Sequence, residues 1–214
     1  MKILVTAGPT REFLDPIRYL SNRSSGKMGY AVASQAAKRG HSVTLVSGPV
    51  ALSPPAGATL VSVVSALELL TAVQQHLAAC DALVMTAAVA DWRPRETAAT
   101  KLKKRSMTPV LELEPNPDIL LTIRPLKGSR IFVGFAAETD NVLAEAQGKL
   151  DRKGLDLLVA NDVSQPDAGF EVDTNRVTFL SHGVSPQPFP LLSKLAVADA
   201  ILDWLEHRAE GAAR

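Results

Sequence analysis

Short apolar runs alternate with helical stretches in the first half of the sequence, and this alternation restricts the fold more than any other feature. Lys2 to Thr6, His41 to Val46 and Ala82 to Thr86 are runs of the length and composition of buried strands. Helical stretches from Tyr30 to Arg39 and from Ala66 to Ala79 lie between them. An order of strand, helix, strand, helix, strand implies a mostly parallel sheet with right-handed crossovers. The sequence therefore predicts an α/β fold.

The rest of the chain continues this pattern within one domain. Its 214 residues, of which 46% are hydrophobic, suffice for one well-buried core and are too few for two ordinary domains. We therefore expect residues 1–214 to form a single Rossmann-like domain, with a mostly parallel sheet sandwiched by helices. The final helix should bury an apolar stripe that includes Leu191 and Leu195. Further strands are expected at Ala58 to Val63, Pro109 to Glu114, Arg130 to Phe135, Leu155 to Ala160 and within Gly169 to Leu180, and further helices at about Asn141 to Lys153 and Phe189 to His207.

A long polar loop, which begins at Gly8, joins the first strand to a glycine-flanked helix start. The unpaired N–H groups and the positive dipole of a helix start attract anions, and parallel sheets bind ligands at the carboxyl ends of their strands. A phosphorylated ligand is therefore the first hypothesis, and a surface loop without function is the alternative. The loop supplies side chains that suit phosphate or carboxylate oxygens: the hydroxyls of Ser21, Ser24 and Ser25, the amide of Asn22, and the cations of Arg11, Arg23 and Lys27.

The spacing of this loop excludes two familiar phosphate-binding motifs. A Walker loop carries Ser or Thr after its Gly-Lys pair, where this chain has Met28. The dinucleotide fingerprint places three glycines in a tight turn, whereas Gly8 and Gly26 are far apart in the sequence. An NAD-binding unit also needs an acidic residue at the end of the second strand, where Ser47 and Gly48 stand. These features weaken the alternative of an NAD(P)-binding Rossmann oxidoreductase.

A second group of polar residues follows the predicted strand that ends at Thr86. Four small residues let a ligand approach the backbone there, and Asp91 and Trp92 add a carboxylate and an aromatic ring. The basic run from Lys101 to Arg105 comes next and by itself fits a solvated face or a nucleic-acid patch. A non-catalytic nucleotide- or nucleic-acid-binding module is thus a further alternative. The formal net charge of +1 gives no overall attraction to nucleic acid or to an anionic membrane, so neither partner is expected.

The cysteine and histidine residues indicate neither a disulfide nor a metal site. Cys80 is the single cysteine and follows an alanine-rich helical stretch, which predicts a buried structural thiol. The four histidines lack metal-ligand spacing, so no metal-ligating residue is predicted. No signal peptide precedes the first strand, and no apolar run approaches 18 residues. We therefore expect a cytoplasmic protein.

Seven motifs together resemble those of a known enzyme family, the phosphopantothenoylcysteine synthetases. In most bacteria this enzyme is the C-terminal half of a bifunctional coenzyme A biosynthesis protein. The resemblance covers nearly all of the chain, with the motifs in family order. They are Thr6-Ala7-Gly8-Pro9-Thr10-Arg11-Glu12, Ser21-Asn22-Arg23-Ser24-Ser25-Gly26-Lys27-Met28-Gly29, Ala87-Ala88-Val89-Ala90-Asp91-Trp92, the Lys-x-Lys-Lys at Lys101 to Lys104, Asn116-Pro117-Asp118-Ile119, Gly134-Phe135-Ala136-Ala137-Glu138-Thr139 and Ala160-Asn161-Asp162-Val163.

The resemblance implies a two-step ligation that depends on Mg²⁺. CTP activates the carboxylate of 4′-phosphopantothenate as an acyl cytidylate with loss of pyrophosphate, and the amine of L-cysteine then displaces CMP. The Lys-x-Lys-Lys version of the lysine motif implies CTP, because relatives with another version use ATP. A ligase that uses ATP is therefore the alternative within the family.

The resemblance also assigns residues, with Asn22 and Lys101 as the implied catalytic pair. Asn22 would hold the acyl cytidylate for aminolysis by donating from its amide to the acyl carbonyl. Lys101 would be a catalytic or phosphate-stabilising cation. The implied nucleotide contacts are Met85, Thr86, Ala87, Asp91, Lys101, Pro117, Asp118, Ile119, Leu120, Phe135, Lys149 and Lys153. The implied phosphate- or substrate-binding loop comprises Gly8, Ser24, Ser25, Gly26, Lys27, Met28, Gly29 and Ala88.

The family forms homodimers, in which flaps cover the partner's site, and the same is expected here. The dimer strands should lie around Pro109 to Glu114 and Thr174 to Leu180. The long polar loop and the Lys101 segment would act as mobile lids. Because Met1 stands directly before the first strand, we expect the decarboxylase half to be absent and the chain to be a stand-alone enzyme or an excised domain. It could still associate with a phosphopantothenoylcysteine decarboxylase domain.

Overall fold

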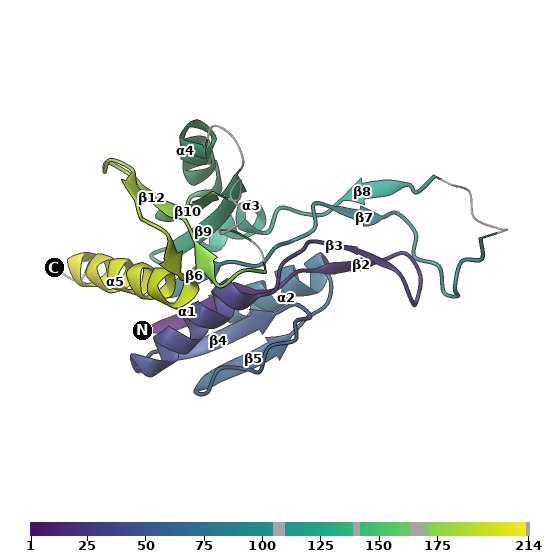
Figure 1. Cartoon of the computed structure of the whole chain (residues 1–214), viewed down its shortest axis with the longest axis horizontal. Coiled ribbons are helices and arrows are strands. Elements are labelled where there is room, and N and C mark those ends of the chain that lie inside the picture. Colours follow the sequence, from purple (N-terminus) through teal and green to yellow (C-terminus); the bar gives the residue numbers. More distant parts are fainter. Residues whose placement is uncertain (105–109, 139–141, 163–168, 170, 213–214) are drawn as a thin grey trace.

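One mixed sheet forms the centre of the computed structural model, which describes residues 1–104, 110–138, 142–162, 169 and 171–212 (Figure 1). Its eight strands lie in the order β13-β12-β10-β9-β6-β1-β4-β5. The strands are β1 (Lys2–Ala7), β4 (Ser42–Ser47), β5 (Ala58–Ser62), β6 (Ala82–Met85), β9 (Ile131–Glu138), β10 (Leu157–Asp162), β12 (Val177–Ser181) and β13 (Gln187–Pro188). The six strands from β10 to β5 are parallel to one another, whereas β12 pairs antiparallel with β10 and with β13. The prediction of a mostly parallel sheet is confirmed.

Helices cover both faces of this sheet, as predicted. Side chains alternate between the two faces of a strand, so Ile3 and Val5 of β1 enter one hydrophobic core while Leu4 enters the other. The first core is closed by α1 and α5 and the second by α2, α3 and α4. The helices are α1 (Lys27–Lys38), α2 (Ala66–Leu77), α3 (Ile119–Ile123), α4 (Val142–Lys153) and α5 (Lys194–Ala212), with the 3-10 turn η1 (Arg124–Leu126) after α3.

The strand order has a consequence for ligand binding. The chain leaves β1 toward β4 on one side, whereas β6 and the later parallel strands lie on the other side. The six parallel strands thus have the order of a dinucleotide-binding Rossmann sheet, with the reversal of direction between β1 and β6. A crevice opens at the carboxyl ends of the strands at such a point, and ligands bind there.

Two hairpins project from the sheet and lie side by side (Figure 1). The first pairs β2 (Arg11–Phe13) with β3 (Tyr19–Ser21), and the second pairs β7 (Trp92–Pro94) with β8 (Leu113–Pro115). We call residues 11–21 and the described residues of 92–115 the arm. Exposed apolar side chains are frequent on the arm: Ile17, Tyr19, Trp92, Val110, Leu111 and Leu113.

The structure corrects several predicted element boundaries. The long polar loop contains the β2–β3 hairpin, which its polar composition concealed. The strand expected at Pro109 to Glu114 is limited to Leu113–Pro115, and Pro109 lies outside the described residues. Most of Thr174 to Leu180, expected as a dimer strand, belongs to β12, which pairs with β10 and β13 of the same chain. These residues therefore pair within the chain, and their place at a dimer interface stays a prediction.

The final helix begins later than predicted. It starts at Lys194 rather than Phe189, because residues 192–193 form strand β14 (Leu192–Ser193), paired with β11 (Thr174–Asn175). The hydroxyl of Ser193 accepts a hydrogen bond of 3.1 Å from the N–H of Ala196, which fixes the helix start. Leu191 and Leu195 are consequently exposed, so their place in the apolar stripe was wrong. In the described part of the chain, no helix has the length and apolar character needed to cross a membrane.

Candidate functional site

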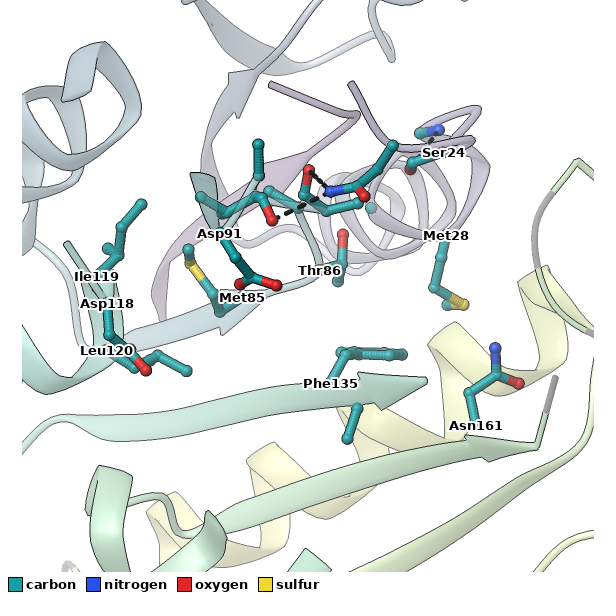
Figure 2. Close-up of a pocket in the computed structure, with 18 of the residues that line it drawn as sticks. Ser24, Met28, Met85, Thr86, Asp91, Asp118, Ile119, Leu120, Phe135 and Asn161 are labelled. Atoms are coloured by element: carbon teal, nitrogen blue, oxygen red, sulfur yellow. Dashed lines mark hydrogen bonds between the residues drawn. The ribbon is translucent and has the colours of Figure 1, made fainter. Parts of the chain in front are cut away.

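A cavity of about 770 Å³ lies at the reversal point between β1 and β6 (Figure 2). Its walls come from the start of α1, the segments that follow β6 and β8, the start of α3, the carboxyl ends of β9 and β10, and parts of residues 169–194. The segments after β1 and β6 are joined by hydrogen bonds from Ala88 N to Gly8 O (2.9 Å) and from Thr10 N to Ala88 O (3.2 Å). The cavity therefore lies where the sheet topology predicts a ligand.

The start of α1 forms one wall of the cavity, and two glycines allow it to come so close. Gly26 has a φ of 77°, a left-handed conformation that glycine adopts without strain. A Cβ at Gly29 would lie 2.5 Å from Thr86 Oγ1 and 2.8 Å from Thr6 O. Only glycine lets the first turn of the helix pack against the ends of β1 and β6. The unpaired N–H groups of that turn are available for an anion.

Asn22 is held at the edge of the cavity by the segment that follows β6. Its Nδ2 donates hydrogen bonds to Ala88 O (3.1 Å) and Val89 O (3.0 Å). Carbonyl oxygens only accept, so the amide nitrogen must face them, and both of its hydrogens are used. The expected donation to an acyl carbonyl is thus not available in this arrangement. Oδ1 is the side-chain atom of Asn22 that remains as an acceptor.

Most of the predicted nucleotide residues meet in this cavity. Asp118, at the start of α3, is held by two contacts: its Oδ1 accepts from Leu121 N (3.1 Å) and caps α3, and its Oδ2 lies 3.0 Å from Lys153 Nζ. Figure 2 shows Asp91, Asp118 and Phe135 around the same space. The predicted residues that line the cavity are Asn22, Ser24, Ser25, Gly26, Lys27, Met28, Gly29, Met85, Thr86, Ala87, Ala88, Asp91, Pro117, Asp118, Ile119, Leu120, Phe135 and Lys153.

Three predicted residues do not line this cavity. Gly8 lies behind it, where a Cβ would come within 2.9 Å of Val50 Cγ1. Lys149 lies one helical turn before Lys153 on α4 and is not part of the cavity wall. Lys101 is exposed on the arm. Lys101 could therefore act in this cavity only after a movement of the arm, or in the same cavity of a second copy of the chain.

Two of the cations in the polar loop, Lys27 and Arg23, have acidic partners. Lys27 Nζ lies 2.7 Å from Asp173 Oδ1 and donates to Glu171 O (3.0 Å), and Arg23 Nη2 lies 2.6 Å from Glu171 Oε2. The Lys27 ammonium lowers the pKa of Asp173 below its ordinary value. A phosphate at the start of α1 would compete with these carboxylates for the two cations.

Among the cavity-lining residues that the sequence analysis did not assign to the site, Lys194 and Asn161 carry buried polar groups. Lys194 is buried, and its Nζ donates to Gly169 O (2.9 Å) and to Val172 O. Burial lowers the pKa of this ammonium to about 8. Asn161, at the end of β10, is buried in the cavity wall, and its Oδ1 has no hydrogen-bond partner among the described residues. Asn161 belongs to the motif Ala160-Asn161-Asp162-Val163. Lys194 lay inside a predicted helix, and nothing in the sequence indicated that it lines a binding site.

The acidic residues of the cavity fit a magnesium ion carried by a nucleotide. No cluster of three or more His, Cys, Asp or Glu side chains suited to a metal occurs among the described residues. Magnesium in nucleotide sites needs only one or two carboxylates, with phosphates and water as the other ligands. Asp118 is engaged by Lys153 and by its helix cap. Asp91 is exposed in the cavity wall and is the carboxylate that fits such an ion.

Cys80 lies away from the cavity. It is buried, its Sγ donates to Leu77 O (3.3 Å), and burial raises its pKa to about 11. A thiol with a raised pKa is a poor nucleophile because the thiolate is the reactive form. The expected burial is confirmed.

Comparisons with known sequences point to one group of proteins. A sequence model of the family described as DNA/pantothenate metabolism flavoprotein C-terminal domain matches residues 1–208. The Coenzyme A biosynthesis bifunctional protein CoaBC of Vibrio cholerae is 46% identical over 211 residues, which are 97% of this chain and 52% of that protein. The protein of the same name from Escherichia coli is 46% identical over 213 residues, with the same coverage of 97% and 52%. The chain thus spans about half the length of these curated relatives.

Solved structures support the same grouping. The crystal structure of the C-terminal domain of Coenzyme A biosynthesis bifunctional protein CoaBC is 43% identical, with a TM-score of 0.85, and the match covers 98% of this chain and 96% of that one. A DNA/pantothenate metabolism flavoprotein from Streptococcus pneumoniae has a TM-score of 0.85 at 23% identity, over 97% of this chain and 99% of that chain. The second likeness concerns the fold alone.

Proposed function

The chain belongs to the DNA/pantothenate metabolism flavoprotein C-terminal domain family, as its motifs predicted, and from this premise we propose that it is a phosphopantothenate–cysteine ligase. The reaction joins the carboxylate of 4′-phosphopantothenate to the amine of L-cysteine and converts CTP to CMP and pyrophosphate. The observation that carries the proposal is the meeting of the α1 start and Asn22 in one cavity. The start of α1 suits a phosphate, and Asn22 suits an acyl group or the amine that attacks it.

The first step forms the acyl cytidylate. A carboxylate oxygen attacks the α-phosphorus of CTP, and the bond to the pyrophosphate oxygen breaks. Carboxylate and triphosphate repel each other, so catalysis requires positive charge and N–H donors around the phosphates. The first turn of α1 supplies N–H groups, and Lys27 and Lys153 supply positive charge at the cavity wall. A magnesium ion bound with CTP would add Lewis-acid neutralisation of the phosphates, with Asp91 to hold it.

The second step forms the amide. The cysteine nitrogen attacks the acyl carbon, the bond to the CMP oxygen breaks, and the amine loses a proton. Asn22 keeps its proposed place in this step with an altered role. Its two amide hydrogens hold the segment after β6. Its free Oδ1 would accept a hydrogen bond from the attacking amine and orient the nitrogen lone pair toward the acyl carbon.

The choice of CTP rests on the lysine motif at Lys101 to Lys104 and stays a proposal. ATP is the alternative within the same reaction. An NAD(P) oxidoreductase is disfavoured because the end of β4 offers no carboxylate for a ribose: Ser47 Oγ there contacts Tyr30 Oη (3.2 Å) and Gly48 O (2.8 Å).

We also propose that the protein works as a homodimer joined through the arm. The exposed apolar side chains of the arm, including Trp92 and Leu113, support this assembly. Lys101 lies on the arm outside the cavity of its own chain, so a partner's cavity is the site that we expect it to serve. Association with a decarboxylase domain, which the bifunctional relatives suggest by their greater length, and a cytoplasmic location stay predictions.

The test is pyrophosphate release from CTP or ATP with 4′-phosphopantothenate and Mg²⁺, measured with and without L-cysteine. We expect cysteine-dependent turnover with CTP and a single-turnover burst of pyrophosphate without cysteine. A preference for ATP would keep the ligase and refute the reading of the lysine motif. No release with either nucleotide from folded protein would refute the ligase and favour the non-catalytic binding module.

A further inference from the structure

A buried carboxylate sits inside the projecting arm, where few side chains are shielded from water. The side chain of Asp15, in the turn between β2 and β3, has no exposed surface. Its Oδ1 accepts from the N–H groups of Ile17 (2.9 Å) and Arg18 (2.9 Å). Its Oδ2 accepts from Arg18 Nε (3.0 Å) and Nη2 (2.5 Å) and from Leu102 N (3.2 Å). Burial of a charge is costly unless the charge is paired and hydrogen-bonded, and both conditions are met here.

The same ion pair forms hydrogen bonds with both the N–H and the carbonyl group of Leu102. Asp15 accepts from the N–H of Leu102, and Arg18 Nη2 donates to the carbonyl of Leu102 at 2.9 Å. We call Asp15, Arg18 and the Leu102 peptide groups the clasp. Leu102 is 87 positions from Asp15 in the sequence, so the clasp joins two distant segments of the arm. Because the guanidinium and the N–H groups favour the carboxylate, the pKa of Asp15 lies well below its ordinary value, and the clasp stays charged at neutral pH.

Further hydrogen bonds continue the attachment toward the base of the arm. Ala98 N donates to Leu14 O (2.9 Å), and Thr97 Oγ1 donates to Phe13 O (2.9 Å). The clasp lies at the far end of this series, next to the basic run. Leu102 stands between Lys101 and Lys103, both of which are exposed. The clasp therefore fixes the backbone from which the lysine side chains extend.

We propose that Asp15 is a positioning residue that, through the clasp, sets the place of Lys101 for the ligation reaction. The proposal rests on the proposed function, in which Lys101 is a cation for the triphosphate. A long lysine side chain on a free loop would spend little time at one point in space. A fixed backbone removes most of that freedom, and a small misplacement of a catalytic group costs a large factor in rate.

The first test measures the clasp without reference to catalysis. In the wild-type protein, we expect the amide of Leu102 to exchange its hydrogen much more slowly than those of Lys101 and Lys103. In Asp15→Asn, trypsin should cut after Lys101, Lys103 or Lys104 at least roughly 10-fold faster than in wild type, at a temperature at which both proteins are folded. Glu112→Gln is the matched control, because Glu112 forms an exposed ion pair with Arg95 on the same arm (3.0 Å). Its cleavage should equal that of wild type.

The second test separates positioning from mere stabilisation. Asp15→Asn should lower kcat roughly 10- to 100-fold in the wild-type background and cause no further loss in Lys101→Gln. An equal loss in both backgrounds would overturn the positioning role. If Asp15→Asn fails to fold, the exchange of Leu102 in the wild type still decides: an unprotected amide in an active enzyme would refute the clasp. Lack of turnover in the wild type would instead refute the proposed ligase.

Discussion

At the residue scale, Asn22 shows how a structure changes the reason for an expected effect. Asn22→Asp should leave cysteine-independent pyrophosphate release largely intact and block amide formation. The variant would place a carboxylate oxygen against Ala88 O and Val89 O, at the positions where Nδ2 now lies 3.1 and 3.0 Å away. That repulsion should turn the side chain away and remove the acceptor for the amine. Single-turnover assays with and without cysteine measure the two steps separately.

The Asn22→Asp variant has a further signature in its pH dependence. A carboxyl held against two carbonyl oxygens should have a raised pKa, because only its protonated form can donate to one of them. Amide formation by the variant should therefore recover in part as the pH falls, whereas the wild type should not gain. Equal loss of both steps at every pH would contradict the role assigned to Asn22.

Cys80 provides a prediction about the second hydrophobic core. Because its thiol is buried and has a pKa of about 11, native protein at pH 8 should react slowly with a thiol reagent such as iodoacetamide. Unfolded protein should react at the rate of a free cysteine. Cys80→Ser should keep the ligase activity, with at most a modest loss of thermal stability. Rapid labelling of the folded protein, or an inactive folded variant, would show that this thiol has a functional role.

At the element scale, the close contact between α1 and the ends of β1 and β6 depends on the absence of a side chain at Gly29. Gly29→Ala should destabilise the fold by about 1–3 kcal/mol, because overpacking forces the helix away from β1 and β6. The added Cβ would meet Thr86 Oγ1 and the backbone of Thr6 at 2.5 and 2.8 Å. Nucleotide affinity should fall as well, since the first turn of α1 moves away from the cavity. Chemical denaturation and nucleotide titration measure the two effects.

Gly148→Ala is the matched control for this substitution. Gly148 is exposed on α4, and a Cβ there would meet no described atom within 4 Å. Alanine has the higher helix propensity, so this variant should gain up to about 1 kcal/mol of stability. Comparable losses in both variants would mean that the close approach at Gly29 is not what sets the position of α1.

The elements that sequence periodicity predicted well are those whose burial is determined locally. β1, β6 and α2 match their apolar runs, and Ser65 caps α2 by accepting from Glu68 N at 3.2 Å. The β2–β3 hairpin was missed because its strands pack on other parts of the arm and show no clear alternation. The start of α5 was misplaced because pairing of β14 with β11, a tertiary contact, overrides the local apolar pattern.

The site was predictable to the same limited extent. The family resemblance assigned both Asp118 and Lys153 to the nucleotide, and the two line one cavity although 35 positions separate them in the sequence. The hydrogen-bond partner of each side chain could not be predicted from residue types and their spacing in the sequence. The amide of Asn22 faces two carbonyls, and Lys27 faces Asp173. Lys194 enters the wall only because α5 begins beside Gly169 and Asp173, which no pattern in the sequence indicates.

At the scale of the whole molecule, the position of Lys101 on the arm has a consequence for assembly. The described chain brings Asn22 to the cavity and leaves Lys101 outside it. If the arm of each protomer reaches the cavity of its partner in a homodimer, each active site takes Asn22 from one protomer and Lys101 from the other. Closure of the arm over its own cavity is the competing arrangement. The two arrangements predict different activities for a dimer that contains one Asn22 variant protomer and one Lys101 variant protomer.

Mixing two strongly impaired variants distinguishes these arrangements. Asn22→Asp and Lys101→Gln should each keep only a small residual ligase activity alone, and equal amounts should regain roughly a quarter of wild-type activity after subunit exchange. Random exchange makes half of the dimers mixed, and each mixed dimer has one site with both residues intact. If each arm closes over its own cavity, every site keeps one defect and mixing restores nothing. Exchange must be verified with two affinity tags, because proof of mixed dimers without any regain would show that Lys101 acts within its own chain.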